Sequence, residues 1–337
     1  MSNYNYEICL RPVENYFFGG ERTFGQAQDE QSNYFAVSNK YPQQTALLGL
    51  LRYLLLEHNQ WLPLKDHKTE ASKAIGDRSF DVKMEATQDF GVIQSLSPLF
   101  MKRAEEVFRF THPLDQLRLS LEEKVEALGA NGQTGPLVKP EGFNSKTYYP
   151  ELLIGDQGDR SVYSDVFLKK EQIGILKQSE KDGFFKQASY HLSKGWYFSF
   201  YVHLEGSFVL PEEAKVSFGA EQKQFFVQVK SIKSQDLPSF LKPGEGSDKL
   251  TLLSDALVDG SIYEHCRFSL SDTVDFRTVQ IGFEGAKFRK DSVKHNLLKR
   301  GSILIPKAGQ MGDLESALQQ NQNFRNIGFN HYFKSNL

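Results

Sequence analysis

The sequence predicts an α+β protein made of two tandem ferredoxin-like (RRM-like) domains. Two observations lead to this fold class: short strand-like segments come in two successive sets, and few helical segments separate them. The turn at Pro211-Glu212-Glu213 is a plausible boundary, so we expect an N-terminal domain over residues 1–210 and a C-terminal domain over residues 211–337. A chain of 337 residues is long enough for two such cores.

The N-terminal domain is expected to begin with a strand at 4–12 and a loop at 15–25 that is rich in aromatic residues, glycine and arginine. Apolar residues surround nearly the whole circumference of a predicted helix at 45–56, as in a helix that lies on a sheet. Residues 60–150 follow an irregular pattern that is too long for a simple connection, which indicates an elaborated insertion. Further strands are expected at 165–168, 172–176 and 195–204.

The C-terminal domain is expected to contain strands at 224–230 and 278–283, with a segment of mixed character at 250–258 between them. A basic segment follows and leads into residues 299–307, which begin Lys-Arg-Gly-Ser and continue as a short apolar run. Neither set of strands is interrupted by a short-period repeat or a low-complexity tract.

The composition is that of an ordinary globular protein, with 24% charged and 39% hydrophobic residues and a net charge of −2. This balance gives no global argument for nucleic acid, so any such argument depends on local patches. Cys9 and Cys266 lack metal or redox spacing and are expected to be reduced, buried thiols. We expect a cytoplasmic protein with no membrane contact, because the N-terminus lacks a signal-peptide pattern and the longest apolar run, 46–51, is far short of the roughly 20 residues that a membrane span needs.

The first candidate site is the loop Gly19–Gly25 together with the start of the helix that follows it. Arg22 supplies a cation, Phe17, Phe18 or Phe24 could stack on a base, and the helix start at Gln43, Gln44 and Thr45 leaves backbone N–H donors unpaired. These groups are suited to holding a phosphate-bearing chain such as RNA. The alternative is a structural strand-to-helix turn whose aromatic side chains fill the core.

The second candidate site is the basic segment Gly285–Lys307. Seven positive residues stand against a single negative one, Asp291, in a chain whose overall charge is −2. The seven are Lys287, Arg289, Lys290, Lys294, Lys299, Arg300 and Lys307. The alternative is a solvated surface whose charge is compensated elsewhere in the fold.

The strand 194–201 partly matches the aromatic RNA-contacting strand of RNA-recognition domains. An alternating strand with one buried face explains the same residues more simply.

Catalysis finds little support in the sequence. The eight histidines never fall at metal-ligand spacing, and we find neither a Gly-x-Ser-x-Gly elbow nor an adjacent aspartate pair of the kind that holds two metal ions. Only His58, at the end of the predicted helix, could act as a general acid or base. A polar residue at a helix C-terminus is the simpler interpretation.

Several short segments, spread in order over most of the chain, match one family. Residues 17–24 are similar to an aromatic-Arg/Asp-Gly-Arg-Pro-Phe opening, and residues 45–52 to a Gly-x-x-Arg helix. Other matches lie at 172–176 with 183–190, at 216–221, at 301–304 and at 327–329. Together they resemble the Cmr subunit-three proteins, which are RAMP subunits of type III-B CRISPR effectors.

The resemblance implies a non-catalytic subunit without cofactor or metal. Such a subunit binds and caps the 5′ handle of the CRISPR RNA, docks the large polymerase-like subunit, contacts the backbone RAMP subunits and meets target RNA indirectly. We place Arg22 and the helix start on handle phosphates, Phe24 against a base, and the turn Lys299–Ser302 as a second half of the clamp. The full predicted RNA-binding set is Arg22, Phe24, Gln43, Gln44, Thr45, Lys299, Arg300, Gly301 and Ser302.

Two other functions stay open at this point. A RAMP-type endoribonuclease that processes precursor CRISPR RNA would use His58 as its general acid or base. A protein–protein adaptor would instead present the basic segment to an acidic partner.

Overall fold

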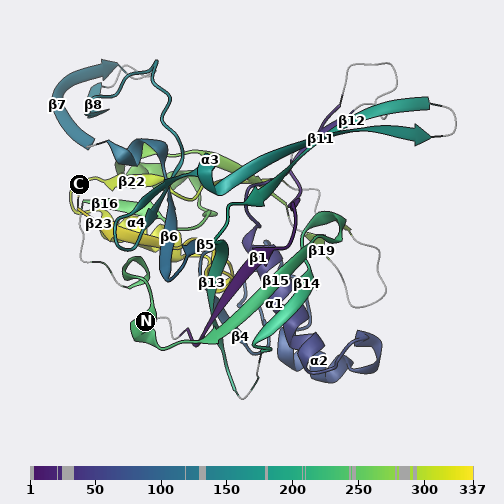
Figure 1. The fold of residues 1–337 in the computed structure, drawn as a ribbon. Coiled ribbons are helices and arrows are strands. Elements are labelled where there is room, and N and C mark those ends of the chain that lie inside the picture. Colours follow the sequence, from purple (N-terminus) through teal and green to yellow (C-terminus); the bar gives the residue numbers. More distant parts are fainter. Residues whose placement is uncertain are drawn as a thin grey trace.

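The computed structural model shows an α+β protein with several sheets and few helices, which confirms the α+β part of the predicted fold class (Figure 1). The structure describes residues 4–20, 22–24, 34–117, 119–128, 134–178, 181–206, 208, 210–242, 244, 248–277, 279–280, 289–290 and 294–336. Within these residues, no helix is long and apolar enough to cross a membrane. Cys9 and Cys266 are free and buried, as predicted, and burial raises the pKa of the Cys9 thiol to about 12.

The largest sheet has nine strands and β1 lies near its middle. Eight of them run in the order β10-β9-β6-β5-β13-β1-β15-β14, while β4 also pairs with β13. Their bounds, in chain order, are β1 Tyr6–Pro12, β4 Ile93–Leu96, β5 Phe100–Arg103, β6 Glu106–Thr111, β9 Leu152–Gly155, β10 Arg160–Val162, β13 Trp196–Leu204, β14 Glu213–Ser217 and β15 Gln224–Ser231. Strand β1 is antiparallel to both neighbours, so Ile8 lies opposite Phe200 on one side and Val229 on the other.

The pairing in this sheet crosses the boundary expected at residue 210. Strands β14 and β15 follow that boundary and still pair beside β1, and three further strands, β4 to β6, come from the expected insertion at 60–150. Local patterns predicted three of these nine strands, β1, β13 and β15, but carry no information about which strand lies beside which. The division into two tandem ferredoxin-like domains therefore stays a prediction.

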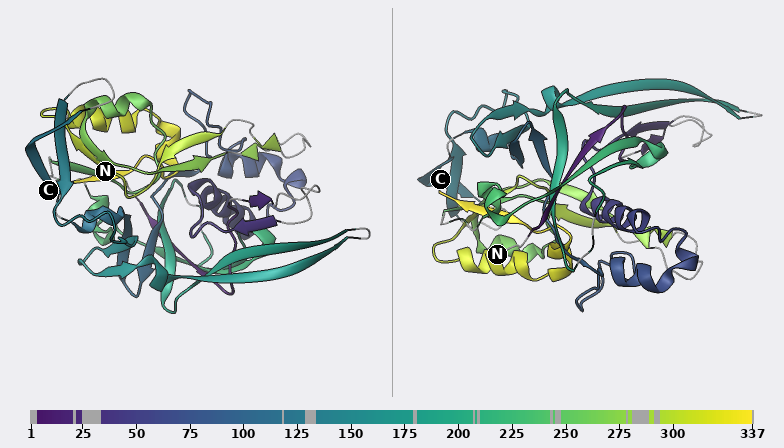
Figure 2. Two further views of the ribbon diagram at one scale, coloured as in Figure 1. Left: turned by 90° about the horizontal axis from the view of Figure 1, so that it is seen from above. Right: turned by 60° about the horizontal axis from the view of Figure 1, so that its bottom comes forward.

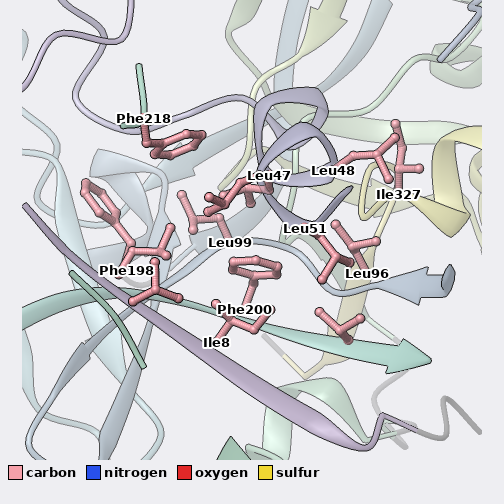
Figure 3. Close-up of a cluster of buried hydrophobic side chains, with 14 of the residues drawn as sticks. Ile8, Leu47, Leu48, Leu51, Leu96, Leu99, Phe198, Phe200, Phe218 and Ile327 are labelled. Atoms are coloured by element: carbon pink, nitrogen blue, oxygen red, sulfur yellow. The ribbon is translucent and has the colours of Figure 1, made fainter. Parts of the chain in front are cut away.

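Helix α1 (Gln44–His58) covers one face of the nine-stranded sheet, which confirms the predicted helix. Leu47 and Leu51 pack with Ile8, Phe198 and Phe200 in one buried cluster (Figure 3). Each such fully buried side chain stabilises the fold by roughly 1.5–3 kcal/mol relative to an exposed one. This packing fixes where the N-terminal end of α1 lies.

A long two-stranded arm extends away from the sheet and helix (Figures 1 and 2). It consists of β11 (Phe167–Gln178) and β12 (Lys181–Leu192), with β3 (Tyr34–Val37) parallel to β12 and β2 (Arg22–Phe24) paired to β3. A separate ribbon is formed by β7 (Leu119–Leu128) and β8 (Thr134–Pro140).

The C-terminal part forms a four-stranded sheet that packs beside the first sheet. Its order is β17-β22-β16-β23, and β18 pairs with β21 next to it. The strand bounds are β16 Lys249–Leu252, β17 Cys266–Leu270, β18 Thr273–Phe276, β21 His295–Leu298, β22 Ile303–Pro306 and β23 Tyr332–Ser335. Of the strand predicted at 278–283, the structure describes Val279–Gln280 as β19, paired with β20 (Arg289–Lys290), and the rest lies outside the described residues.

The remaining helices are short. The α-helices are α2 Lys68–Ile75, α3 Tyr163–Val166, α4 Met311–Gln319 and α5 Gln322–Asn326. The 3-10 helices are η1 Leu64–Asp66, η2 Pro113–Gln116, η3 Ala220–Gln222, η4 Ser234–Asp236, η5 Ser239–Leu241 and η6 Gly260–His265.

Candidate RNA interface

Two segments that are far apart in the sequence meet at the N-terminal end of α1. Lys40 and Gln43, just before the helix, and Lys299, just after β21, line one hollow of about 250 Å³ together with Tyr41 and Glu151. Gln43 and Lys299 belong to the two halves of the site expected from the sequence. The structure therefore brings part of each half together.

Glu151 holds the two lysines of this hollow. Its carboxylate accepts hydrogen bonds from Lys40 Nζ and from Lys299 Nζ, the latter at 2.9 Å. Burial alone would raise the pKa of Glu151, but the hydrogen bonds from both lysines bring it below its ordinary value. The side chains of Lys40, Lys299 and Glu151 are 32%, 29% and 25% exposed, so this cluster of three charges is partly open to solvent.

The helix start divides into a buried and an accessible part. Gln44 is fully buried, and its side-chain amide donates to the carbonyls of Ser97 (2.9 Å) and Ile327 (3.0 Å) and accepts from the N–H of Leu99 (3.1 Å). Its side chain therefore ties α1 to its neighbours. Gln43 is the N-cap residue without a side-chain capping bond, and Gln43 and Thr45 are half-buried.

Arg300, the residue after Lys299, points into the protein. Its side chain is 1% exposed, and it bonds to Asp255 through Nε (3.3 Å) and Nη2 (3.2 Å). The guanidinium carbon lies 4.4 Å from the ring centroid of Tyr41 and 5.0 Å from that of Phe110. Burial opposes the charge on Arg300, but Asp255 more than offsets it, so the pKa of Arg300 is raised. Its third nitrogen, Nη1, has no hydrogen-bond partner but is buried. This arginine therefore holds the fold together and presents no accessible group to a phosphate.

Gly301 and Ser302 complete a tight, buried turn. Gly301 has φ +83°, and a Cβ atom there would lie 2.7 Å from the backbone carbon of Thr111 and 2.8 Å from the nitrogen of His112. Only glycine suits both the left-handed backbone and this close approach to the end of β6. The Ser302 hydroxyl donates to the Lys299 carbonyl at 2.6 Å. Both residues shape the turn that positions Lys299.

Arg22 and Phe24 lie on β2, opposite Ala36 and Tyr34 of β3. The side chains of both residues fall outside the described part of the structure. The neighbouring Phe17 is buried, and the Phe18 ring packs against core phenylalanines, so these two aromatic residues fill the core, in line with the structural alternative.

The basic segment is only partly described. Lys287 and Asp291 lie outside the described residues, and Arg289 and Lys290 are described by backbone alone. Lys294 forms an ion pair with Asp275. Lys299 is thus the cation of this segment that the structure places in the hollow.

The endoribonuclease alternative depends on His58. Within the described part of the chain, this histidine has no hydrogen-bond or ion-pair partner that could assist catalysis. This residue is exposed in the last turn of α1, so the 15-residue helix separates it from the hollow by roughly 20 Å. Among the described residues, no group of three or more His, Cys, Asp or Glu side chains could hold a metal ion.

Sequence reasoning missed Lys40 and Glu151. Lys40 is a lone cation before the helix, and Glu151 follows the irregular region 60–150, so neither stands out in the sequence. The one available signal was position, because Lys40 lies three residues before the N-cap of a predicted helix. Their partnership is a product of the fold.

The family of the chain follows from a comparison with family models. The model for "CRISPR-associated protein (Cas_Cmr3)" matches residues 8–336, which include the nine-stranded sheet, the arm and the C-terminal sheet. The chain belongs to the Cmr3 family. The resemblance drawn from short motifs is therefore confirmed, and the Cmr3 match spans nearly the whole chain.

One solved structure shares the fold of this chain. A chain of the "Type III-B Cmr-beta bound to cognate target RNA" is similar at TM-score 0.52 and 12% identity, covering 97% of this chain and 96% of its own. A chain of the "Type III-B Cmr-beta bound to cognate target RNA and AMPPnP, state 1" has TM-score 0.48, 13% identity and coverage of 97% and 99%. A chain of the type III-A Csm3-Csm4 subcomplex has TM-score 0.36, 11% identity and coverage of 90% and 93%. The curated proteins contain no match.

Proposed function

We propose that this chain is a non-catalytic subunit of a type III-B CRISPR effector that binds and caps the 5′ handle of the CRISPR RNA. The observation that carries the proposal is the accessible pair Lys40 and Lys299 at the N-terminal end of α1, in one hollow with Glu151. Membership of the Cmr3 family supports the same role.

The chemistry of the hollow suits a phosphate of single-stranded RNA. The first turn of an α-helix has N–H groups without partners inside the helix and carries the positive end of its dipole. Two ammonium groups lie beside it, and the anion they hold in this structure is the Glu151 carboxylate. A phosphate that takes the place of this carboxylate would keep both lysines paired.

Within this proposal the predicted residues have different tasks. Lys299, Gln43 and Thr45 face the RNA, while Gln44, Arg300, Gly301 and Ser302 hold the helix start and the turn in place. Arg22 and Phe24 on β2 remain proposed contacts to phosphate and base. Lys40 joins the set of phosphate-binding residues.

The remainder of the family role belongs to the same proposal. We expect the chain to dock the large polymerase-like subunit and to contact the backbone RAMP subunits, with target RNA met indirectly. We also retain the proposal of two tandem ferredoxin-like domains, residues 1–210 with an insertion at about 60–150 and residues 211–337.

Binding of a labelled handle RNA to the full chain, measured by fluorescence anisotropy over a range of salt concentrations, tests the role of the lysine pair. The double variant Lys40→Gln/Lys299→Gln should bind at least ten-fold more weakly and should lower the magnitude of the salt slope by roughly 0.7 for each phosphate that is no longer neutralised. The control Lys215→Gln changes an exposed lysine on β14, at the opposite edge of the sheet from β9 and β10.

Equal affinity of wild type and double variant would contradict the proposal. Cleavage of repeat RNA by the full chain, lost on His58→Ala, would establish the endoribonuclease instead. Because His58 is exposed, this variant leaves the fold intact.

A further inference from the structure

The loop 141–150, between β8 and β9, carries the most exposed large apolar side chain of the described residues. Tyr148 is 85% exposed, compared with 41% for Phe143 in the same loop. We propose that Tyr148 is a stacking platform for one unpaired base of the RNA, next to the lysine pair. This inference rests on the proposed function and adds a base-contacting residue to it.

The loop is built to hold its shape. The rings of Phe143 and Tyr149 stack with centroids 5.7 Å apart and planes at 19°. The Tyr149 hydroxyl accepts from the N–H of Asn144 at 2.9 Å, and the Asn144 side-chain oxygen accepts from the N–H of Lys146 at 2.9 Å. A further backbone bond joins the N–H of Thr147 to the Asn144 carbonyl at 2.9 Å. Tyr148 is therefore presented to solvent by a closed, internally bonded loop.

The loop ends at the proposed phosphate site. Tyr148 lies three residues before Glu151, so their Cα atoms are at most about 11 Å apart. Glu151 is anchored, because its carbonyl accepts from the N–H of Tyr163 at 3.0 Å and its carboxylate holds Lys40 and Lys299. A strand with a phosphate on these lysines has a base within reach of the Tyr148 ring.

The surroundings of Tyr148 favour a base over a protein surface. Its neighbours Asn144, Ser145, Lys146 and Thr147 are all exposed and polar. A protein interface has an apolar core of several contiguous side chains, whereas base stacking needs one aromatic face with a cation nearby. The loop exposes the Tyr148 ring almost fully and the Phe143 ring in part, among polar neighbours. One open aromatic face, with Lys146 beside it and two lysines at the end of the loop, matches the second arrangement.

The test uses the full chain and a handle RNA in which 2-aminopurine replaces one base at a time. For wild type, one position should show strong fluorescence quenching on binding, which Tyr148→Ala removes and Tyr148→Trp restores. Tyr148→Ala should weaken binding about ten-fold without changing the salt slope, because every phosphate keeps its cation. Tyr263→Ala, at an exposed tyrosine of η6, is the matched control and should bind like wild type.

The outcomes separate this inference from the proposed function. If the lysine double variant weakens binding while Tyr148→Ala leaves affinity and quenching unchanged, the stacking role is wrong and the handle-binding role stands. If wild type binds no handle RNA, both fail. If Tyr148→Ala disturbs assembly with other effector subunits and leaves RNA binding intact, the loop is a protein contact and the inference is overturned.

Discussion

Lys299 and Arg300 are neighbours in the sequence and carry the same charge, but they lie in opposite environments. The Lys299 side chain is 29% exposed and shares Glu151 with Lys40, whereas the Arg300 side chain is 1% exposed and is paired with Asp255. In the proposed site, Lys299 exchanges its carboxylate partner for a phosphate. Arg300 cannot make this exchange, because its departure would leave the buried Asp255 carboxylate without a cation. Both residues carry the same charge, so the difference in their proposed roles comes from how deeply each side chain is buried and from the carboxylate that it is paired with.

Removing the buried partner should have the largest effect. Arg300→Met leaves Asp255, only 9% exposed, without its cation, and the free energy of unfolding should fall by about 3–5 kcal/mol. Urea denaturation of the full chain measures this loss. The double variant Arg300→Met/Asp255→Asn should recover most of it, because no unpaired charge remains and the amide oxygen still accepts from the backbone N–H of residue 300. An Arg300→Met variant with wild-type stability and weakened RNA binding would contradict the structural role and would make Arg300 an RNA-binding residue.

The turn that separates the two cations should show an intermediate effect. Gly301→Ala forces a Cβ atom against the backbone of Thr111 and His112 at a positive φ, so stability should fall by about 2 kcal/mol. Gly49→Ala is the matched control, since Gly49 lies in the exposed face of α1 with open space around it. There the same substitution should stabilise the protein by up to about 1 kcal/mol. Thermal unfolding of both variants checks the difference, and equal effects would contradict it.

Loss of the half-buried Glu151 carboxylate should change stability least and should strengthen RNA binding. Glu151→Gln removes partly exposed ion pairs, so stability should fall by less than about 1 kcal/mol. Handle RNA should bind roughly five-fold more tightly, because both lysines are freed for phosphate, a gain of about 1 kcal/mol. Glu105→Gln is the control, since this exposed carboxylate also lies near two lysines, Lys102 and Lys230, elsewhere on the sheet.

The same variant gives a pH test. The pKa of Glu151 is lowered in the folded protein, so its contribution to stability is present above the ordinary carboxyl pKa of 4.5 and is lost as the pH falls through the folded value. The stability difference between wild type and Glu151→Gln should therefore shrink below about pH 4.5. A difference that grows on acidification would contradict this assignment.

Local pattern predicted much of the fold and less of the site. The apolar residues of α1, and the alternation of apolar and polar residues in β13 and β15, lie within short continuous stretches of sequence, so these elements could be predicted. The pairing of β1 with β15 joins residues more than two hundred positions apart, and local periodicity carries no such information. Lys299 was found through its basic segment, whereas Lys40 and Glu151 acquire their meaning only when the fold brings them together. Arg300 looked like a ligand residue because Asp255, which neutralises it, lies 45 positions away.

The central place of β1 also determines when the sheet can form. Strand β1 is synthesised before both of its neighbours, β13 and β15. Roughly 180 residues separate it from the nearer of these in the sequence, which takes about 10–40 s at ordinary rates of synthesis. During that interval both edges of the apolar strand β1 lack their partner strands. A nascent chain that stops before β15 keeps one of those edges unpaired, and an unpaired strand edge is a site for aggregation.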